Sequence, residues 1–283
     1  MPSKQRPKIA IAGASGFIGT AVCREFSKDY DIIALTRSPA RSETADPEVR
    51  ITWCHCDLFS ASEVEAALRG ADYALYLVHS MLPSSRLTQA KPEDMDLLIA
   101  DNFARAAQRN GVRQILYVGA IVPDSFKISR LLWSRREVEM MLASHDTPVT
   151  SLRADLVVGP GGSSLNMLVK LVQRMPVMPL PRAARCETQP IALQDLMRAL
   201  RFCLGNADTH GSHFDIGGPQ PLTYRRILRQ TGEVLGKRRL MFTLPFVPLR
   251  LVALFARLIS GAPAALVRPL IESLSQNTPV KDN

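Results

Sequence analysis

Apolar and polar positions follow two different periods along the first part of the chain. Short runs rich in Ile, Val, Leu and Ala are typical of buried strands, and they alternate with longer stretches whose apolar residues recur at helical spacing. Expected strands lie at 8–13, 31–37, 50–55, 72–78, 114–120 and 149–159, and expected helices at 17–29, 60–70, 92–111 and 129–144. Because parallel strands are joined by helical crossovers, this order predicts an α/β fold, a Rossmann doubly wound parallel sheet.

The regular alternation ends near residue 160. Prolines become frequent between 176 and 190, and the later pattern predicts helices at 192–204, 223–235 and 247–274 and a strand at 213–217. We therefore expect a Rossmann domain over 1–160 and a small, mostly helical C-terminal lobe over 161–283. Strands from this lobe are expected to return to the main sheet, and the lobe is expected to bind a substrate or a partner.

Composition and charge narrow the class of protein. With 46% hydrophobic and 22% charged residues, the chain has enough apolar material for a large core. The net charge of +9 favours acidic ligands, phosphates, nucleic acid or an anionic membrane surface. The N-terminus lacks the apolar segment of a secretory signal, and no stretch is long enough to span a bilayer, so we expect a cytoplasmic protein.

The five cysteines form neither a disulfide framework nor a metal-binding spacing. Cys54 and Cys56 alternate along an expected strand and so share one of its faces, which favours buried thiols over metal ligands. No metal site is predicted.

A glycine-rich turn between the first strand and the first helix is the strongest functional signal. Gly13, Gly16 and Gly19 would give a tight turn, room for a pyrophosphate against bare backbone, and close packing of helix on strand. In this context the turn predicts dinucleotide binding. The residues assigned to it are Gly13, Ser15, Gly16, Phe17, Ile18 and Gly19.

The end of the second strand indicates which dinucleotide binds. An acidic residue there would hold the ribose of NAD(H), but this chain has Thr36, Arg37 and Ser38. Arg37, with Ser38 or Arg41, is suited to the 2′-phosphate, so NADP(H) is preferred over NAD(H). The alternative is an exposed loop arginine.

Asp57 and Leu58 follow the third strand. The aspartate could accept a hydrogen bond from the adenine amino group while the leucine packs on the ring. Asp57 could equally be a turn or helix-capping residue.

Several motifs together resemble the atypical, extended short-chain dehydrogenase/reductase superfamily, which includes NmrA-like regulators and the Rossmann accessory subunit of respiratory complex I. They are GASGFIG, the Asp-Leu pair at 57–58, YLVHSM at 76–81, SLRADLVVGPG at 151–161 and FDIGGPQPLTYRRIL at 214–228. YLVHSM, SRREVEMML, TQPIALQDL and VRPLIESL are also similar to the bacterial YbjT-type NAD(P)-binding group. This resemblance covers residues 8–275.

The resemblance implies that Val78, His79 and Ser80 approach the cofactor ribose and that the loop after Arg153 lies near the nicotinamide. His79 is then a candidate proton donor or ribose contact. The alternative is a histidine hydrogen-bonded within a pocket at the strand end.

Active members of this superfamily use a Tyr and a Lys four residues later on one helix face, with a helper Ser after the fifth strand. Alignment through Glu139 places Leu131 and Arg135 at the Tyr and Lys positions, and Gly119 and Ala120 stand where the Ser is expected. Arg135 is a fixed cation for a ribose or phosphate and a poor proton relay. Its alternative role is an ion pair with Glu139 one helical turn away.

Two functions remain open. The first is an NADPH-dependent oxidoreductase that lacks the Ser/Tyr/Lys set and takes its proton from His79, water or the substrate. The second is a non-catalytic NADP(H)-binding sensor or assembly protein. Nucleic acid is not an expected partner, because the arginines of TYRRILRQ alternate with apolar helix positions.

The apolar, arginine-bearing stretch at 240–275 has its own alternatives. It could line a substrate cleft, form a homodimer interface, or lie peripherally on the inner face of the membrane. A cleft or a dimer interface is the more frequent use of such a helix.

Overall fold

The computed structural model describes residues 6–38, 50–78, 92–123, 128–244, 248–261, 267, 271 and 275–281. Its main feature is a seven-stranded sheet in the order β11-β6-β5-β4-β1-β2-β3, in which every neighbouring pair is parallel. The strands are β1 (Lys8–Ala12), β2 (Asp31–Thr36), β3 (Ile51–His55), β4 (Tyr73–Tyr76), β5 (Gln114–Gly119), β6 (Val149–Arg153) and β11 (His213–Asp215). The predicted Rossmann sheet is therefore confirmed, with the reversal of strand order between β1 and β4.

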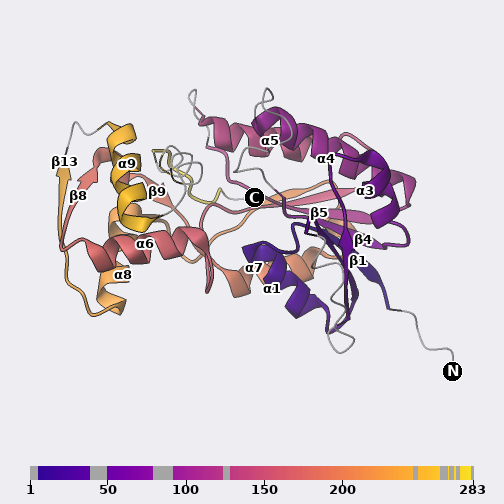
Figure 1. The fold of residues 1–283 in the computed structure, drawn as a ribbon, viewed down its shortest axis with the longest axis horizontal. Helices are drawn as coiled ribbons and strands as arrows, with labels where there is room; N and C mark the ends of the chain where they lie inside the picture. Colours follow the sequence, from indigo (N-terminus) through magenta and orange to yellow (C-terminus); the bar gives the residue numbers. More distant parts are fainter. Residues whose placement is uncertain are drawn as a thin grey trace.

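Helices cover both faces of this sheet (Figure 1). On one face lie α3 (Ala61–Ala67), α4 (Pro92–Arg109) and α5 (Arg130–Leu142), and on the other lie α1 (Phe17–Phe26) and α7 (Leu193–Cys203). Pro92 begins α4 at a position where no backbone N–H is needed, and Gly111 follows the helix with a φ of 65°, as the sequence predicted.

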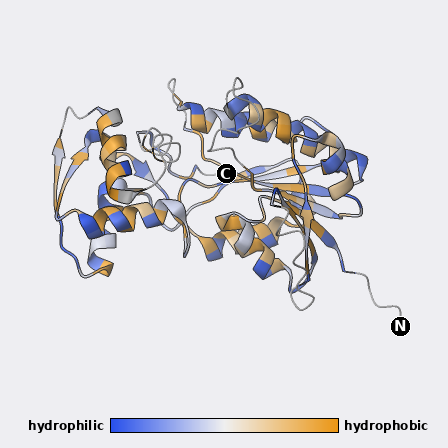
Figure 2. Ribbon diagram, viewed as in Figure 1, coloured by the Kyte–Doolittle hydropathy of each residue, from blue (hydrophilic) through white to orange (hydrophobic). Residues whose placement is uncertain are grey.

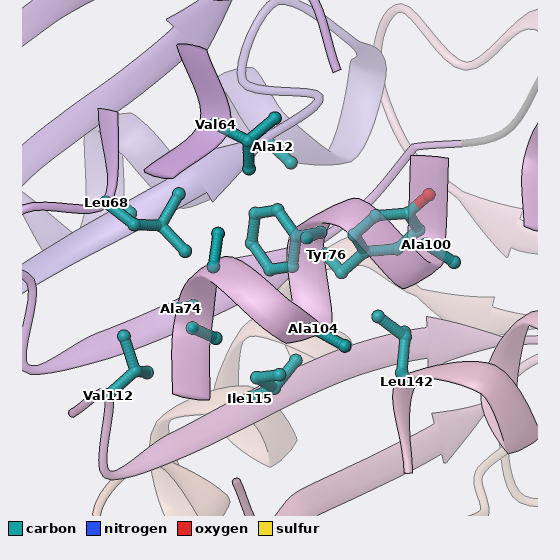
Figure 3. Packing of buried hydrophobic residues seen from close by; sticks show 14 of the residues in the cluster. Ala12, Val64, Leu68, Ala74, Tyr76, Ala100, Ala104, Val112, Ile115 and Leu142 are labelled. Carbon is teal, nitrogen blue, oxygen red and sulfur yellow. The ribbon is translucent and has the colours of Figure 1, made fainter. Parts of the chain in front are cut away.

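The core under α3, α4 and α5 is built around aromatic side chains. Figure 3 shows Tyr76 of β4 among aliphatic side chains from the sheet and the helices. Its ring meets that of Phe103 edge to face, with centroids 5.1 Å apart, and Tyr117 of β5 lies beside it. These contacts fix α4 and α5 over the carboxyl half of the central strands.

The C-terminal lobe lies beyond the carboxyl edge of the sheet (Figure 1). Its helices are α6 (Ser163–Arg174), α8 (Tyr224–Val234) and α9 (Leu249–Ser260). Its strand pairs are β7 (Val157–Val158) with β10 (Ile191–Ala192), β8 (Val177–Pro181) with β13 (Leu240–Leu244), and β9 (Glu187–Thr188) with β12 (Leu222–Thr223). Two short 3₁₀ turns lie at η1 (Arg182–Arg185) and η2 (Ala207–Thr209).

The chain leaves the Rossmann sheet and returns to it. After α6 and β8, α7 packs beside α1 and β11 joins the edge of the main sheet, before α8, β13 and α9 complete the lobe. The strand expected at 213–217 is thus found in the main sheet. The exact domain boundary at residue 160 stays a prediction.

Two expectations for the lobe differ from the structure. Strands β8 and β13 were not expected, because Pro179 and Pro181 argue against a strand interior in β8. Proline is tolerated here because β8 has a single partner strand among the described residues. The expected helix over 247–274 is also interrupted: α9 ends at Ser260, and Gly261 caps it with a φ of 68°.

Within the described residues, no helix has the length and apolarity needed to cross a bilayer.

Candidate functional site

The glycine turn between β1 and α1 has the geometry that its sequence predicted. Gly13 has a φ of +85°, and a Cβ there would lie 2.8 Å from the carbonyl oxygen of Leu77. A Cβ on Gly19 would lie 2.1 Å from the carbonyl oxygen of Gly13, so helix and turn touch through bare backbone. Both positions therefore require glycine.

The N-terminus of α1 is free to receive an anion. Gly16 precedes the helix in an extended conformation, and the first turn carries no acidic side chain. Gly16, Phe17 and Ile18 line a cleft. Because backbone N–H groups and the positive end of the helix dipole point there, this end of the cleft suits a phosphate.

The cleft has a volume of about 280 Å³ and lies where the Rossmann sheet meets the C-terminal lobe. Its walls come from the glycine turn, the ends of β4, β5 and β6, the first turns of α5 and α6, and the start of α8. Most lining groups are apolar. Among the described residues that line it, those with ionisable side chains are Arg135, Asp155 and Tyr224.

The helix that should carry the catalytic pair does face this cleft. Leu131 and Arg135 of α5 both line it, as do Gly119 and Ala120 after β5. The positions that the resemblance assigned to Tyr, Lys and Ser are therefore in the expected place, and none of them holds a group that can exchange a proton at neutral pH.

Arg135 is not paired with Glu139. The Arg135 side chain forms no ion pair with the described residues, and its backbone carbonyl accepts a hydrogen bond of 3.1 Å from the Tyr117 hydroxyl. Glu139 instead pairs with Arg136 and Arg153. The alternative role expected for Arg135, an ion pair with Glu139, is therefore wrong, because two other guanidinium groups occupy the carboxylate.

A buried ion-pair cluster anchors α5 to the sheet. Arg153 donates from Nε and Nη2 to the two oxygens of Glu139, at 2.9 and 2.7 Å. Its Nη1 also lies 3.8 Å from a carboxylate oxygen of Asp215 in β11. The three side chains are only 12%, 10% and 5% exposed, respectively. Two carboxylates thus surround one guanidinium, and the cluster joins α5, β6 and β11.

A polar cluster at the lobe side of the cleft was missed from the sequence. One carboxylate oxygen of Asp155 accepts hydrogen bonds from the hydroxyls of Thr188 and Thr278, and a side-chain hydrogen bond joins Thr188 to Tyr224. Burial raises the pKa of Asp155 above its usual value, although the two threonine hydroxyls oppose the shift.

Burial, and then the nearby Asp155 carboxylate, raise the pKa of Tyr224 well above 10. This phenol therefore stays neutral at physiological pH and keeps a proton that it can donate. No motif relates Asp155 to Tyr224 in the sequence. They meet because β9 pairs with β12 and Thr278 forms a bridge with Thr188.

The residues predicted to hold the adenosine part lie along the same carboxyl edge of the sheet, outside the lining of the cleft. Arg37 and Ser38 are exposed directly after β2, and Ser15 is exposed in the glycine turn. Thr36 before them is buried and accepts a hydrogen bond of 3.1 Å from the Ser38 backbone N–H. No acidic side chain follows β2 within the described part of this loop.

Asp57 has the structure of a turn residue. Its carboxylate accepts a hydrogen bond of 3.2 Å from the Phe59 N–H, and its carbonyl accepts one from Ser60. Leu58 and Val78 pack partly buried against the core. Contacts of these three residues with a cofactor stay predictions. His79, Ser80 and Arg41 lie outside the described residues.

Cys56 is buried in the core and Cys54 packs against the same core only partly buried, so the two share one face of the strand as their alternation predicted, but only the Cys56 thiol is buried as expected. Burial raises the pKa of Cys56 to about 12, so it is held as a neutral thiol. Among the residues that the structure describes, no group of His, Cys, Asp and Glu has the arrangement of a metal site.

Two curated proteins are similar to this chain in sequence. Ceramide reductase of Caulobacter vibrioides is 24% identical over 255 residues, which cover 87% of this chain and 76% of that protein. Auxiliary protein GraX of Staphylococcus aureus is 33% identical over 126 residues. That alignment covers 44% of this chain and only 40% of GraX, less than half of either protein.

Solved structures share the fold. Triphenylmethane reductase from Citrobacter sp., in complex with NADP(H), superposes with a TM-score of 0.75 and 19% identity over 98% of this chain and 92% of that one. An NADPH-dependent quinone oxidoreductase from Escherichia coli gives a TM-score of 0.68 and 20% identity over 94% and 87%. The model of a family described as NAD(P)H-binding matches residues 13–155, just over half of the chain. The chain therefore belongs to this NAD(P)H-binding family, with the fold of the atypical short-chain dehydrogenases/reductases.

Proposed function

We propose that this protein is an NADP(H)-dependent oxidoreductase that reduces an apolar substrate in the cleft between the Rossmann sheet and the lobe. The observation that carries the proposal is the composition of the cleft. It runs from the glycine turn to an open, mostly apolar chamber lined by Leu131, Leu156, Val157, Met167 and Leu168. A chamber of this kind gives a second, apolar molecule a place beside the dinucleotide.

The preference for NADP(H) rests on the end of β2. Arg37 is exposed there, Ser38 follows it, and no acidic side chain competes for the ribose hydroxyls in the described loop. A guanidinium fork beside a hydroxyl is well suited to a ribose 2′-phosphate. The N-terminus of α1 would hold the pyrophosphate.

A reductase also needs a proton for the substrate atom that receives negative charge, while bound NADPH supplies the hydride. In our proposal the Tyr224 hydroxyl gives this proton and recovers one from solvent through Thr188 and Asp155, to which it is linked. The raised pKa of Asp155 makes it a better proton reservoir than an ordinary aspartate. Arg135 would stabilise the developing negative charge as a fixed cation. His79 stays a candidate from the sequence.

The names of similar proteins support a reductase with an apolar substrate. They include a ceramide reductase, a triphenylmethane reductase and a quinone oxidoreductase, and two of these names specify NADP(H) or NADPH. Nucleotide-sugar epimerases share the fold as well. The apolar lining of the cleft offers few partners for the hydroxyls of a sugar, so we favour the reductases.

The test is NADPH oxidation with a panel of apolar ketones, quinones and conjugated alkenes, after NADPH binding has been measured. With an active substrate, Tyr224→Phe should lower kcat by about a hundredfold and leave the Kd for NADPH unchanged. Tyr30→Phe, outside the cleft, is the matched control and should keep full activity. Gly16→Asp should abolish NADPH binding, because it places a carboxylate at the N-terminus of α1.

The second candidate is a nucleotide-regulated sensor or assembly protein. Leu131 and Arg135 favour this candidate. They line the cleft at the positions where active members of the superfamily that this chain resembles carry Tyr and Lys. Tight NADPH binding with no oxidation across the whole panel would reject the reductase in favour of this candidate.

A further inference from the structure

The outer side of α9 is apolar and exposed. Leu251, Leu254, Phe255 and Leu258 recur at helical spacing, and Phe255 and Leu258 are 58% and 68% exposed. The opposite side, with Ala256 nearly buried, packs against α6. Apolar side chains in solvent along one face are unfavourable unless something covers them. In the functional-site cleft, none of the described lining residues belongs to α9. The expectation that this helix lines the substrate cleft is therefore wrong for its described part.

A second apolar surface lies at the same end of the lobe. On β13, Leu240, Phe242 and Leu244 alternate outward while Met241 points into the lobe core. Their partners on the outer side of β8 are apolar too, since Leu240 pairs with the exposed Val177 and Phe242 with Pro179. Figure 2 shows the predominantly hydrophobic α9 in this part of the molecule, remote from the Rossmann sheet. We call the exposed residues of α9, β13 and β8 the lobe face.

The elements that form and support the lobe face are strongly basic. From α6 to η1 and from β12 to α9, the sequence contains twelve basic residues and a single acidic residue, Glu233. None of the arginines in these elements forms an ion pair with another described residue. Lys237 and Arg238 are exposed immediately before β13, and Arg257 is exposed beside the apolar row of α9. The lobe thus carries an excess of positive charge next to exposed leucine and phenylalanine.

We propose that the lobe face docks on the surface of a bilayer that contains anionic lipids. The leucine and phenylalanine side chains would enter the boundary between headgroups and acyl chains, while Lys237, Arg238 and Arg257 would meet the lipid phosphates. With twelve residues the helix is too short to span the bilayer, so it would lie on its surface with the apolar side inward. This proposal is independent of the proposed reductase activity, because it uses none of the residues that line the cleft.

The charge favours a membrane over a second copy of the chain. A symmetric dimer through the lobe face would bring two basic surfaces together, and no acidic side chain of these elements other than Glu233 is present to compensate. Anionic lipids would remove that repulsion and cover the apolar side chains at the same time.

Vesicle flotation tests the proposal with the full chain. We expect the protein to float with phosphatidylcholine vesicles that contain phosphatidylglycerol, to float poorly with phosphatidylcholine alone, and to be released at high salt. Phe255→Ser with Leu258→Ser should weaken binding at least about tenfold. Lys237→Gln with Arg238→Gln should weaken it about thirtyfold.

Matched controls separate the lobe face from general surface effects. Phe202→Ser on α7 removes a phenylalanine that is 70% exposed on another part of the molecule, and Arg24→Gln with Arg69→Gln removes two exposed charges from the Rossmann domain. Both should bind vesicles like the parent protein. NADPH binding, measured for each variant, verifies that the fold is intact.

Three outcomes would overturn the proposal: no flotation with either vesicle, equal flotation with both, or equal losses in the control variants. A dimer in light scattering that Phe255→Ser dissociates, without vesicle binding, would assign the lobe face to a second copy instead.

Discussion

Glu139 and Arg153 form a two-point ion pair that fixes α5 on the sheet. Both oxygens of the carboxylate accept hydrogen bonds from the guanidinium, at 2.9 and 2.7 Å, and neither side chain is more than 12% exposed. Arg135 lies one helical turn before Glu139 and lines the cleft. The pair therefore sets the position of a cation that faces the cofactor site, although neither partner lines that site among the described residues.

Glu139→Gln should lower the free energy of unfolding by about 2 kcal/mol, because a charge-assisted hydrogen bond to a buried guanidinium is lost. Asp215 still faces Arg153, which limits the loss. Urea unfolding measures the change. Arg198→Gln breaks an ion pair with Asp195 whose side chains are well exposed, and should change stability by less than about 1 kcal/mol. Equal effects of the two variants would show that the buried pair is not an anchor.

Cofactor preference depends on Arg37 in our proposal. Arg37→Gln should weaken NADPH binding about tenfold and leave NADH binding nearly unchanged, because only NADPH carries the 2′-phosphate. Fluorescence titration with both dinucleotides measures the two affinities. Arg24→Gln, another exposed arginine, serves as the control. Parallel losses for NADPH and NADH would assign Arg37 to some other role.

Removing the hydroxyl group from two core tyrosines should change the free energy of unfolding in opposite directions. The Tyr76 hydroxyl is buried and has no hydrogen-bond partner among the described residues, so Tyr76→Phe should raise the free energy of unfolding by about 1 kcal/mol. The Tyr117 hydroxyl donates to the Arg135 carbonyl, so Tyr117→Phe should lower it by about 1 kcal/mol. Denaturant titrations of the pair provide the measurement. If Tyr76→Phe is the more destabilising variant, the hydroxyl has a partner that the described contacts do not include.

Because of Asp155, the free energy of unfolding should fall as pH rises. Its folded-state pKa is raised above 3.8, so the folded state binds its proton more strongly than the unfolded state does. The stability contributed by this proton is present below about pH 3.8 and is lost as pH rises to the folded pKa. Asp155→Asn removes the titration, so its stability relative to the parent protein should be higher at pH 7 than at pH 4. Unfolding curves at the two pH values test this; a reversed order would mean that the carboxylate is stabilised in the fold.

The sequence was sufficient for the parts of the site that are local in the chain. The glycine turn follows from three glycines between a strand and a helix, and its tight contacts are those of Gly13 and Gly19 with neighbouring backbone. The resemblance placed Leu131 and Arg135 at the Tyr and Lys positions of one helix, and both side chains line the cleft because residues four apart share one face of α5. Local spacing decides these contacts, so one sequence is enough.

The lobe side of the cleft could not be predicted in the same way. Asp155, Thr188, Tyr224 and Thr278 come from four separate segments, and they meet only through strand pairs of two residues and a single bridge. Such short strands leave no periodic pattern. The pairing of Glu139 with Arg153 could not be predicted either, because Arg153 lies on β6, whereas helical spacing relates Glu139 only to residues of α5. Contacts between distant segments are decided by tertiary packing.

The parallel pairing of β8 with β13 has a consequence for synthesis of the chain. The last strand of the Rossmann sheet ends at Asp215, but β8 must wait for Leu240–Leu244 before its backbone groups find the partner strand. Pairings between distant segments form late, and the N-terminal part of a chain folds first on the ribosome. The seven-stranded sheet and its glycine turn could then form before β13 has been synthesised, so the dinucleotide half of the molecule would not depend on completion of the lobe.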